Sequence, residues 1–322
     1  IDSADAPKRA TVELSVPQAE TAAAVAGDAH LVLVVGPAGT GKTTAMRPAV
    51  EQLHADGRVV FGVAPSAAAA QVLGNETGVA ADTIDKLLTE HSLQRPPTHL
   101  YDLPAGATVV VDEAGMVATD TLDRLAVLAD TKGWRVALVG DPMQFSAVGR
   151  GGMYQHLIDA HGAIELDQVH RFTNPWERDA SLRLRRGDPT VADRYDLEGR
   201  LHGGTLARME RQALDAWWTS RVGGESVVLA APTNETVARL NHAAKRRRID
   251  TGDLTASGRH IDANGYRFHV GDEIATRRND RQLHTDQGAM VHNRDQWTID
   301  TVHRNGDLTV AGRAGTTRLP AH

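Results

Sequence analysis

The segment that most constrains the fold is a glycine-rich turn between an apolar run and a helix-like stretch. Residues 31–35 are all apolar, and residues 43–55 have the character of a helix. The turn fits the pattern G-x-x-x-x-G-K-[ST] in full, through Gly36, Pro37, Ala38, Gly39, Thr40, Gly41, Lys42 and Thr43. Its glycines let backbone N–H groups point inward without a Cβ clash, and the N-terminus of the next helix attracts negative charge. A buried strand and a helix must therefore meet around an anion-binding loop.

The residue types of this turn predict a phosphate loop for a nucleoside triphosphate and Mg²⁺. Lys42 would bring a positive charge to the β- and γ-phosphates, and the Thr43 hydroxyl would be a Mg²⁺ ligand. The alternative is a glycine-rich turn that arose by chance. The preceding strand, the following helix and the complete motif together favour phosphate binding.

Two adjacent carboxylates follow another apolar run. Residues 109–111 are all valine and lead directly into Asp112 and Glu113. A parallel sheet presents its ligand site at the carboxyl ends of its strands, so Asp112 would lie near the phosphate loop and hold Mg²⁺, directly or through water. Glu113 would orient and deprotonate the attacking water. The alternative is an acidic pair that caps the next helix, but the position beyond a phosphate loop favours catalysis.

A third strand end carries residues 140–144, with Asp141 followed by Pro142, Met143 and Gln144. A polar cluster there could touch the γ-phosphate and report its loss, although the same residues also suit a simple turn. Further along, Arg171 follows a strand-like step. An arginine from a neighbouring domain can stabilise transition-state charge, and by spacing alone a surface ion pair is an equal alternative.

The apolar runs predict an α/β fold. Residues 31–35, 58–64, 107–111 and 136–139 are nearly continuous in apolar side chains, which is typical of strands buried on both faces of a parallel sheet. Helix-like segments alternate with them, and this order predicts a doubly wound domain. The proline-rich stretch from about 90 to 106 predicts a short insertion.

The second half predicts further strands and helices. A strand is expected near Ile164 and another at 227–231, followed by a helix at 234–248 with Asn234 as its N-cap. Beyond residue 251, short alternating runs separated by Gly, Asn and Asp predict a small all-β module of about five strands. The pair Asn305 and Gly306 lies between two runs and indicates a hairpin.

Composition excludes some classes of protein and leaves others open. The chain has no cysteine, which excludes a disulfide scaffold and cysteine-ligated metal sites and fits a reducing, cytoplasmic compartment. No apolar run approaches the ~18 residues of a membrane span, so no membrane insertion is expected. The net charge of 35 − 41 = −6 gives no global sign of nucleic-acid binding. The first residue is Ile, so an excised piece of a longer polypeptide is expected.

Taken in order, these motifs resemble those of superfamily 1 DNA helicases of the RecD-like group, and especially the helicase part of conjugative relaxases of the TraA/TrwC/TraI type. Gln18 in Val16-Pro17-Gln18 is similar to a Q motif, where it would read adenine, and motif I would run from Gly36 to Thr44. Residues 112–116 resemble motif II, 140–144 motif III and 168–172 motif IV, with Arg171 as the ATP-contacting arginine.

The resemblance also implies DNA contacts. Segments 64–70 and 82–85 are similar to motif Ia and the next DNA-contacting element, and 231–241 to a strand and helix of the second motor domain. Phe145 lies beside motif III and is a candidate to stack on a base. The candidate DNA-binding residues are Pro65, Ser66, Thr83, Phe145, Thr233 and Asn234.

Three basic clusters admit a DNA-binding interpretation, but solvated faces are the usual explanation of such runs. They are Arg183, Arg185 and Arg186; Lys245, Arg246, Arg247 and Arg248; and Arg277, Arg278 and Arg281.

The resemblance implies RecA-like P-loop domains with parallel sheets plus an SH3-like β-barrel insert. Residues 1–163 would form the first motor domain, 164–252 part of a second, and 253–322 the SH3-like module. Two residues depart from the family pattern: Ser66 stands where many relatives have Thr, and Asp85 where they often have His. The family's later motifs are not in this sequence, so the chain is expected to bind nucleotide better than it hydrolyses it.

The function that the resemblance implies is an ATP-dependent DNA helicase or translocase in conjugative plasmid transfer. ATP hydrolysis would drive movement on single-stranded DNA, 5′ to 3′, with other conjugation or relaxosome proteins as further partners. Two alternatives stay open: a P-loop ATPase switch without a DNA role, and a truncated nucleotide- or DNA-binding module with weak catalysis.

Overall fold

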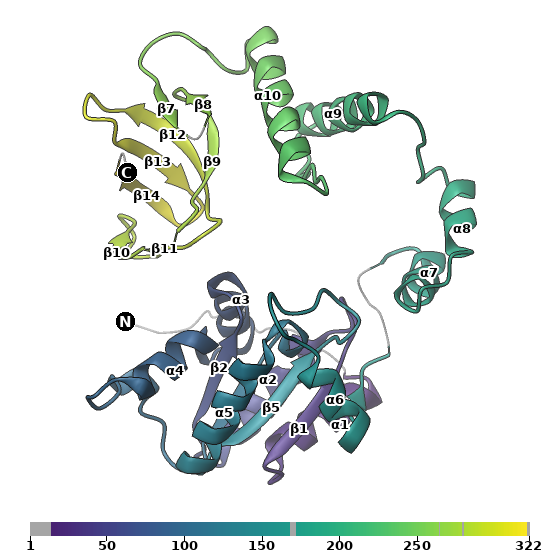
Figure 1. Cartoon of the computed structure of the whole chain (residues 1–322), viewed down its shortest axis with the longest axis vertical. Helices are drawn as coiled ribbons and strands as arrows, with labels where there is room; N and C mark the ends of the chain where they lie inside the picture. The colour runs from purple at the N-terminus through teal and green to yellow at the C-terminus, as the bar shows by residue number, and fades with distance from the viewer. Residues whose placement is uncertain (1–13, 168–171, 264, 279, 321–322) are drawn as a thin grey trace, which may run out of the picture. The chain divides into compact units, whose positions relative to one another are not determined.

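A six-stranded parallel sheet dominates the first half of the chain (Figure 1). The computed structural model describes residues 14–167, 172–263, 265–278 and 280–320. The strand order is β3-β2-β4-β5-β1-β6, and every neighbouring pair is parallel. The strands are β1 (Leu31–Val35), β2 (Val60–Ala64), β3 (Ala80–Thr83), β4 (Thr108–Val111), β5 (Arg135–Gly140) and β6 (Ile164–Glu165).

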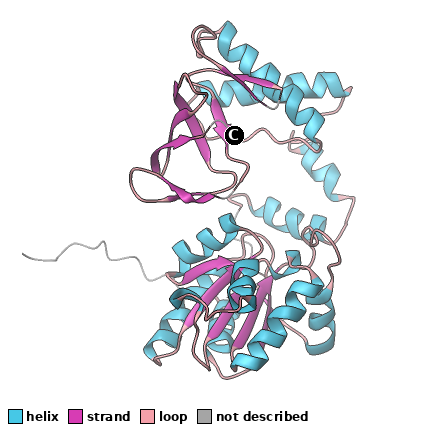
Figure 2. Cartoon of the chain, turned by 60° about the vertical axis from the view of Figure 1, so that its left-hand side comes forward, coloured by secondary structure: helices cyan, strands magenta, loops and turns pink. Residues whose placement is uncertain are grey.

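Helices cover both faces of this sheet (Figure 2). One hydrophobic cluster joins Val34 and Val110 to α1 and α2, while another joins Leu33 and Val109 to α4, α5 and α6. Successive side chains of one strand therefore enter opposite cores, which is why the strands read as continuous apolar runs. The helices are α1 (Val16–Ala26), α2 (Lys42–Ala55), α3 (Ala67–Thr77), α4 (Ile84–Ser92), α5 (Thr119–Lys132) and α6 (Met153–His161), with 3-10 turns at His99–Tyr101 and Ala114–Met116.

The predicted α/β class and the four predicted strands of the first half are confirmed. The sequence does not predict β3, because two alanines, an aspartate and a threonine have little strand character. It forms at the sheet edge through parallel pairing with β2.

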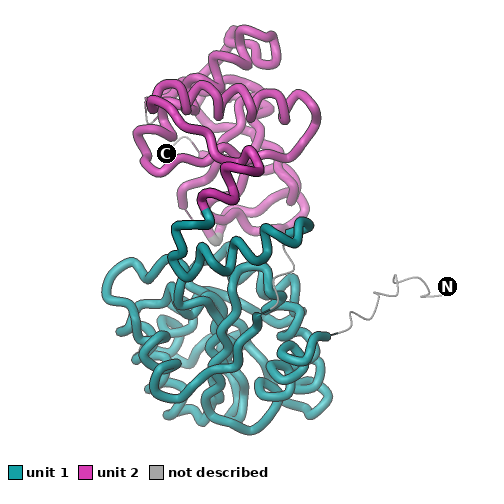
Figure 3. Tube along the Cα trace, turned by 90° about the vertical axis from the view of Figure 1, so that its right-hand side faces the viewer, with its two compact units in different colours: residues 1–191 teal, residues 192–322 magenta. Residues whose placement is uncertain are grey.

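The chain divides into two compact units, residues 1–191 and 192–322 (Figure 3). The division lies later than residue 163, because β6 pairs in parallel with β1 and so belongs to the first sheet. After β6 the first unit continues into α7 (Pro175–Arg185), and α8 (Val191–Leu197) runs across the division.

The second unit contains two long helices and a β-rich region, as predicted from the alternating runs. Its four-stranded sheet has the antiparallel order β14-β13-β12-β9 and surrounds a small core that includes Trp297 and Ile299. The predicted hairpin at Asn305 and Gly306 is confirmed as the β12–β13 turn. The barrel closure and the SH3-like assignment stay predictions. The elements are α9 (Leu206–Val222), α10 (Asn234–Asp250), β7 (Ile261–Ala263), β8 (Tyr266–Phe268), β9 (Glu273–Ala275), β10 (Asp280–His284), β11 (Met290–Val291), β12 (Gln296–Val302), β13 (Leu308–Gly312) and β14 (Gly315–Leu319).

Two predictions for the second unit are wrong. Residues 227–231 form no strand, and Val228 is 83% exposed. In the described part of the chain no other segment pairs with them, and an unpaired strand would leave its backbone groups without partners. The N-cap of α10 is Thr233 rather than Asn234, because the Thr233 backbone is extended and its hydroxyl accepts from the Thr236 amide at 3.2 Å.

Trp217 and Trp218 are only partly covered on α9. An arginine guanidinium lies over each ring, Arg221 at 5.6 Å and Arg247 at 5.8 Å from the centroid. Such cation–π contacts suit a ring that is half exposed. None of the helices in the described residues is both long and apolar enough to cross a bilayer.

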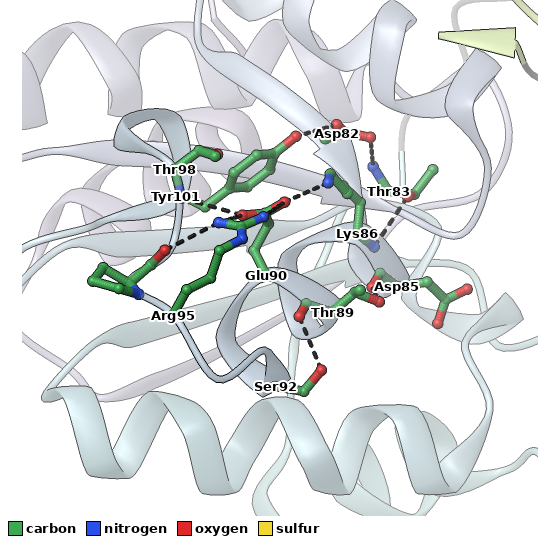
Figure 4. A network of polar contacts seen from close by, with 11 residues as sticks. Asp82, Thr83, Asp85, Lys86, Thr89, Glu90, Ser92, Arg95, Thr98 and Tyr101 are labelled. Carbon is green, nitrogen blue, oxygen red and sulfur yellow. Dashed lines mark hydrogen bonds and ion pairs between the residues drawn. The ribbon is translucent and has the colours of Figure 1, made fainter.

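The segment predicted as an insertion, here residues 93–106, packs closely on the first sheet. The buried Tyr101 donates its hydroxyl to Asp82 Oδ2 at 2.6 Å, at the end of β3 (Figure 4). The indole N–H of Trp134 donates to the carbonyl oxygen of Leu103 at 3.2 Å. The first contact fastens the segment near the carboxyl end of β3, and the second fastens it at the amino end of β5.

The buried carboxylate of Glu90 holds the beginning of the same segment (Figure 4). It accepts from Lys86 and from the Thr98 amide, the latter at 3.1 Å, and Arg95 Nη1 lies 3.3 Å from its Oε2. The hydrogen bond from Lys86, helped by the Thr98 amide and Arg95, lowers the pKa of Glu90 from 4.5 to about 2. Glu90 therefore stays ionised although its side chain is almost fully covered.

This network predicts a specific acid response. Since the folded pKa is lowered, ionised Glu90 contributes its full stabilisation above about pH 4.5 and loses it as the pH falls toward 2. We expect Glu90→Gln to melt below the unmodified chain near neutral pH, with the difference closing toward about pH 3. Thermal melts across this range test it, with Glu51→Gln, an exposed carboxylate on α2, as the control. A difference that does not change with pH would contradict the assignment.

Candidate functional site

The three predicted nucleotide motifs follow three adjacent strands. In the order β4-β5-β1, Asp112 follows β4, Asp141 follows β5 and the phosphate loop follows β1. Because all three strands are parallel, their carboxyl ends meet at one edge of the sheet. The sheet topology therefore brings together residues that lie far apart in the sequence.

The phosphate loop is wound so tightly that only glycine fits at two positions. Gly41 has a left-handed φ of 77° and precedes the first residue of α2, and a Cβ on Gly36 would lie 2.7 Å from Lys42 Cγ. Lys42 Nζ reaches back across the loop and donates to the Gly36 carbonyl oxygen at 3.0 Å. Thr43 and Thr44 are half-buried in the first turn of the helix. This cradle of backbone amides with a lysine at its mouth fits a polyphosphate.

Gln18 is placed against the phosphate loop. Its Nε2 donates to the Thr40 carbonyl oxygen at 3.2 Å, and its Oε1 accepts from the Ser15 amide at 3.0 Å. A Cβ on Gly41 would lie 2.5 Å from that Nε2, so the amide group packs directly on the loop. These bonds join the start of α1 to the loop, and the contact of Gln18 with adenine stays a prediction.

Asp112 and Glu113 lie directly after β4, and the backbone of Glu113 is strained. Glu113 has φ 51° and ψ 41°, a left-handed conformation that is unfavourable for a residue other than glycine. Its amide donates to Asp112 Oδ1 at 2.9 Å. Neither carboxylate caps α5, whose N-cap is Ala118, so the helix-capping alternative is not supported.

Burial raises the pKa of Asp112, although the Glu113 amide and the charge of Lys42 oppose this shift. The carboxylate is therefore largely removed from water and feels the positive charge of the phosphate loop. A partly desolvated carboxylate and a hydroxyl such as that of Thr43 are the hard oxygen donors that Mg²⁺ prefers. The residues present thus fit the predicted cation.

Two glycines that the sequence analysis did not single out allow the motif loops to touch. A Cβ on Gly115 would lie 2.8 Å from the Asp141 carbonyl oxygen, and one on Gly140 would lie 2.9 Å from the Ala114 amide nitrogen. The Gly36 amide donates to the Gly140 carbonyl oxygen at 2.9 Å. The loops after β1, β4 and β5 therefore meet backbone to backbone.

Tyr154 on α6 lies beneath the same loops and was not predicted. Its hydroxyl donates to the Val34 carbonyl oxygen at 2.5 Å. Burial raises the pKa of Tyr154, and the charges of Asp141, Asp112 and Glu113 raise it further. The phenol therefore stays neutral within the field of the three carboxyl groups. No motif marks this tyrosine, so only the folded chain identifies it.

Residues 141–144 form a turn around the carboxylate of Asp141. The backbone amide of Gln144 donates to the backbone carbonyl oxygen of Asp141 at 3.2 Å, and the side-chain Nε2 of Gln144 lies 3.4 Å from Asp141 Oδ2. Arg185 at the end of α7 pairs with the same carboxylate at 2.6 Å. Burial acts to raise the pKa of Asp141, but the hydrogen bonds from Arg185 and the Met143 amide outweigh it, so the pKa is lowered. Residues 141–144 therefore form both a turn and a polar cluster at the end of β5, so the two interpretations are compatible.

Ion pairs involve members of two of the three basic clusters. Arg183 binds Asp188 at 2.9 Å, while Arg247 pairs with Asp215 and Lys245 with Asp272. These pairs favour the structural interpretation of the clusters. Arg185 differs from these residues, because its partner, Asp141, lies in the segment that resembles motif III. Arg171 lies outside the described residues.

Three DNA candidates of the first unit lie at the β3-β2 half of the same sheet edge, whereas Phe145 lies after β5. Pro65 and Ser66 follow β2, and Thr83 ends β3. The Ser66 and Thr83 hydroxyls cap α3 and α4 by accepting from amides at 3.2 and 3.3 Å. Phe145, beside the motif III turn, is 90% exposed.

Thr233 and Asn234 lie at the start of α10 in the second unit, where both are exposed. Thr233 is a third capping residue among the candidates, so the capping requirement alone would account for its hydroxyl.

Comparison with known proteins agrees with this geometry. Residues 13–206 match the family model described as an AAA domain. The conjugal transfer protein TraA of Agrobacterium fabrum is 30% identical over 283 residues, which cover 87% of this chain and 25% of that protein. The ATP-dependent RecD2 DNA helicase of Deinococcus radiodurans is 36% identical over 165 residues, 51% of this chain and 23% of that helicase. The chain spans about a quarter of the length of these relatives.

A solved structure of two coordinating Pif1 helicases that unwind forked double-stranded DNA has a similar fold. Its TM-score is 0.59 at 17% identity, over 96% of this chain and 76% of that chain. At this identity the likeness concerns the fold alone. The family match covers more than half of the sequence, including the phosphate loop, the acidic pair and the turn at 140–144. The chain therefore belongs to the AAA domain family and is a RecD-like helicase domain related to the conjugal transfer protein TraA.

Proposed function

We propose that this chain is the ATP-driven motor of a DNA helicase that moves on single-stranded DNA, 5′ to 3′, in conjugative plasmid transfer. The observation that carries the proposal is the meeting, at one edge of the sheet, of the phosphate loop after β1 with the half-buried Asp112 and the strained Glu113 after β4. The relationship to TraA and RecD2 supports the DNA and conjugation parts of the proposal. Other conjugation or relaxosome proteins are its expected partners.

Each residue at the edge β4-β5-β1 has a proposed task in hydrolysis. The amides of the loop and Lys42 bind the β- and γ-phosphates, and Gln18 contacts the adenine. Thr43 and Asp112 hold Mg²⁺, which when bound neutralises phosphate charge. Glu113 accepts a proton from the water whose oxygen bonds to the γ-phosphorus, while the bond from that phosphorus to the oxygen of ADP breaks. Gln144 contacts the γ-phosphate, and Arg171 is proposed to stabilise the transferred charge.

DNA contacts are proposed at the β2-β3 half of the edge and at Phe145, which follows the turn after β5. The N-termini of α3 and α4 present amides that suit backbone phosphates, beside the hydroxyls of Ser66 and Thr83. Phe145 offers an exposed ring on which a base can stack. Thr233 and Asn234 are proposed as backbone contacts of the second unit.

The proposal predicts the ATPase behaviour of two variants. We expect single-stranded DNA to stimulate turnover of the unmodified chain. Lys42→Ala should lose nucleotide binding, whereas Glu113→Gln should keep binding but turn over ~10²-fold or more slowly, because it lacks a base. Steady-state phosphate release and calorimetric nucleotide binding measure both. Equal turnover in Glu113→Gln would sink the catalytic assignment, and tight binding without turnover by the unmodified chain would support the weak-catalysis alternative.

The strain at Glu113 makes a separate prediction about stability. A left-handed backbone costs an ordinary residue roughly 1–2 kcal/mol, whereas Asn visits it readily. Glu113→Asn should therefore raise the free energy of unfolding by about 1 kcal/mol while losing activity. Glu113→Gln keeps the strain and is the matched control for loss of the carboxylate. Urea unfolding measures the difference, and an Asn variant no more stable than the Gln variant would contradict the strain argument.

The DNA contact predicts a salt-dependent interaction and a role for one aromatic ring. Fluorescence anisotropy with labelled single-stranded oligonucleotides should show affinity that falls as log salt rises. Phe145→Ala should weaken binding by about 1 kcal/mol or more without changing the melting temperature, because the ring is exposed. Val148→Ala, fully exposed in the same loop, is the matched control. Absence of any oligonucleotide binding would favour a P-loop switch without a DNA role.

A further inference from the structure

Arg185 is held by a partner that lies 44 positions earlier in the sequence. It is the last residue of α7, and its guanidinium spans the Asp141 carboxylate, with Nη2 2.6 Å and Nε 3.1 Å from Oδ1 and Nε 3.2 Å from Oδ2. The exposed fractions of the two side chains are 22% for Arg185 and 3% for Asp141. A charge-assisted pair with this geometry and burial fixes the orientation of both groups.

Arg183, two residues earlier, shows what an ordinary surface arginine on this helix does. Its side chain is 41% exposed and pairs with Asp188 and Asp179, which lie five and four positions away. Those contacts are local to α7 and the turn that follows it. Arg185 instead ties the end of α7 to a loop of the parallel sheet.

Asp141 in turn anchors the residue proposed to contact the γ-phosphate. Its Oδ1 accepts from the Met143 amide at 3.1 Å, and its Oδ2 lies 3.4 Å from Gln144 Nε2. Its carbonyl oxygen closes the turn with the Gln144 amide and lies against Gly115 in the motif II loop. The Asp141 carboxylate thus contacts both the backbone and the side chain of the turn that carries Gln144.

From these contacts we propose that Arg185 is a positioning residue that aims Gln144 at the γ-phosphate by holding Asp141. The inference rests on the proposed nucleotide function and deepens it by naming what distinguishes ATP from ADP. Without Arg185, a nearly buried carboxylate lacks its cationic partner and has to turn toward water or take up a proton. Gln144 then loses its anchor, while the phosphate loop still binds the diphosphate.

Calorimetric titration with Mg²⁺–ADP and Mg²⁺–ATPγS tests the inference without requiring hydrolysis. We expect the unmodified chain to prefer ATPγS and Arg185→Met to reduce that preference about tenfold, the value of one lost charge-assisted hydrogen bond. The affinity for ADP should change less than about twofold. Gln144→Ala should have the same effect, and the double variant should be no worse than either single variant, because both remove one unit of interaction.

Two further variants separate positioning from general destabilisation. Arg183→Met removes an exposed arginine from the same helix and should leave the preference unchanged. Arg185→Lys keeps the charge but cannot span both carboxylate oxygens, so it should restore part of the preference. Should Arg185→Met melt below the assay temperature, Arg185→Lys carries the test, because full preference in that variant would overturn the inference.

The outcomes that contradict the inference differ from those that contradict the proposed function. Retention of the ATPγS preference by Arg185→Met, or multiplied effects in the double variant, would overturn the role of Arg185. If Gln144→Ala keeps the preference for ATPγS, the inference is also overturned, because Gln144 would then not be the residue that distinguishes ATP from ADP. Failure of the unmodified chain to bind either nucleotide would instead contradict the proposed function.

Discussion

The hydrogen bond from the Gly36 amide to the Gly140 carbonyl oxygen continues the β1–β5 ladder beyond the last residue of β1 and joins the phosphate loop to the end of β5. It requires β1 and β5 to be neighbours, and that arrangement depends on a sheet buried on both faces. The close approach of Gly115 and Gly140 then brings in the loop after β4. The candidate nucleotide site is thus an extension of sheet pairing, and its precision comes from backbone contacts rather than from long side chains.

The same edge of the sheet is divided between two kinds of chemistry. Its β4-β5-β1 half carries a lysine, three carboxyl groups and the glycine cradle, whereas its β3-β2 half carries the capped N-termini of α3 and α4. The 93–106 segment is fastened beside this second half through Tyr101 and Glu90. A change at one half can therefore reach the other through β2 and β4, which are adjacent strands of one sheet. The proposed nucleotide contacts and the proposed DNA contacts therefore share one sheet as their framework.

Much of the first unit could be predicted from sequence, because its signals are local. The run at 31–35 and the motif after it specify a strand, a turn and a helix within about 25 residues, and the valines before Asp112 do the same for β4. The predictions fail where the local structure depends on a segment or side chain that is distant in the sequence. Residues 227–231 are apolar enough for a strand, but none of the described segments pairs with them. Arg185 sits in a basic run typical of a solvated face, and only the fold reveals that Asp141 lies within reach.

The Ser66 hydroxyl accepts a hydrogen bond from the backbone amide of Ala69. It thus gives a partner to one of the amides at the start of α3 that have none within the helix. Serine is a somewhat better N-cap than threonine, and loss of either for alanine costs ~1 kcal/mol. A threonine at this position would keep the capping bond of the helix, since its extra methyl group takes no part in that bond. Residues that replace Ser66 without loss of the cap would come from the small set of capping residues. Exchanges within this set would preserve the start of α3 while changing the sequence by which the motif is recognised.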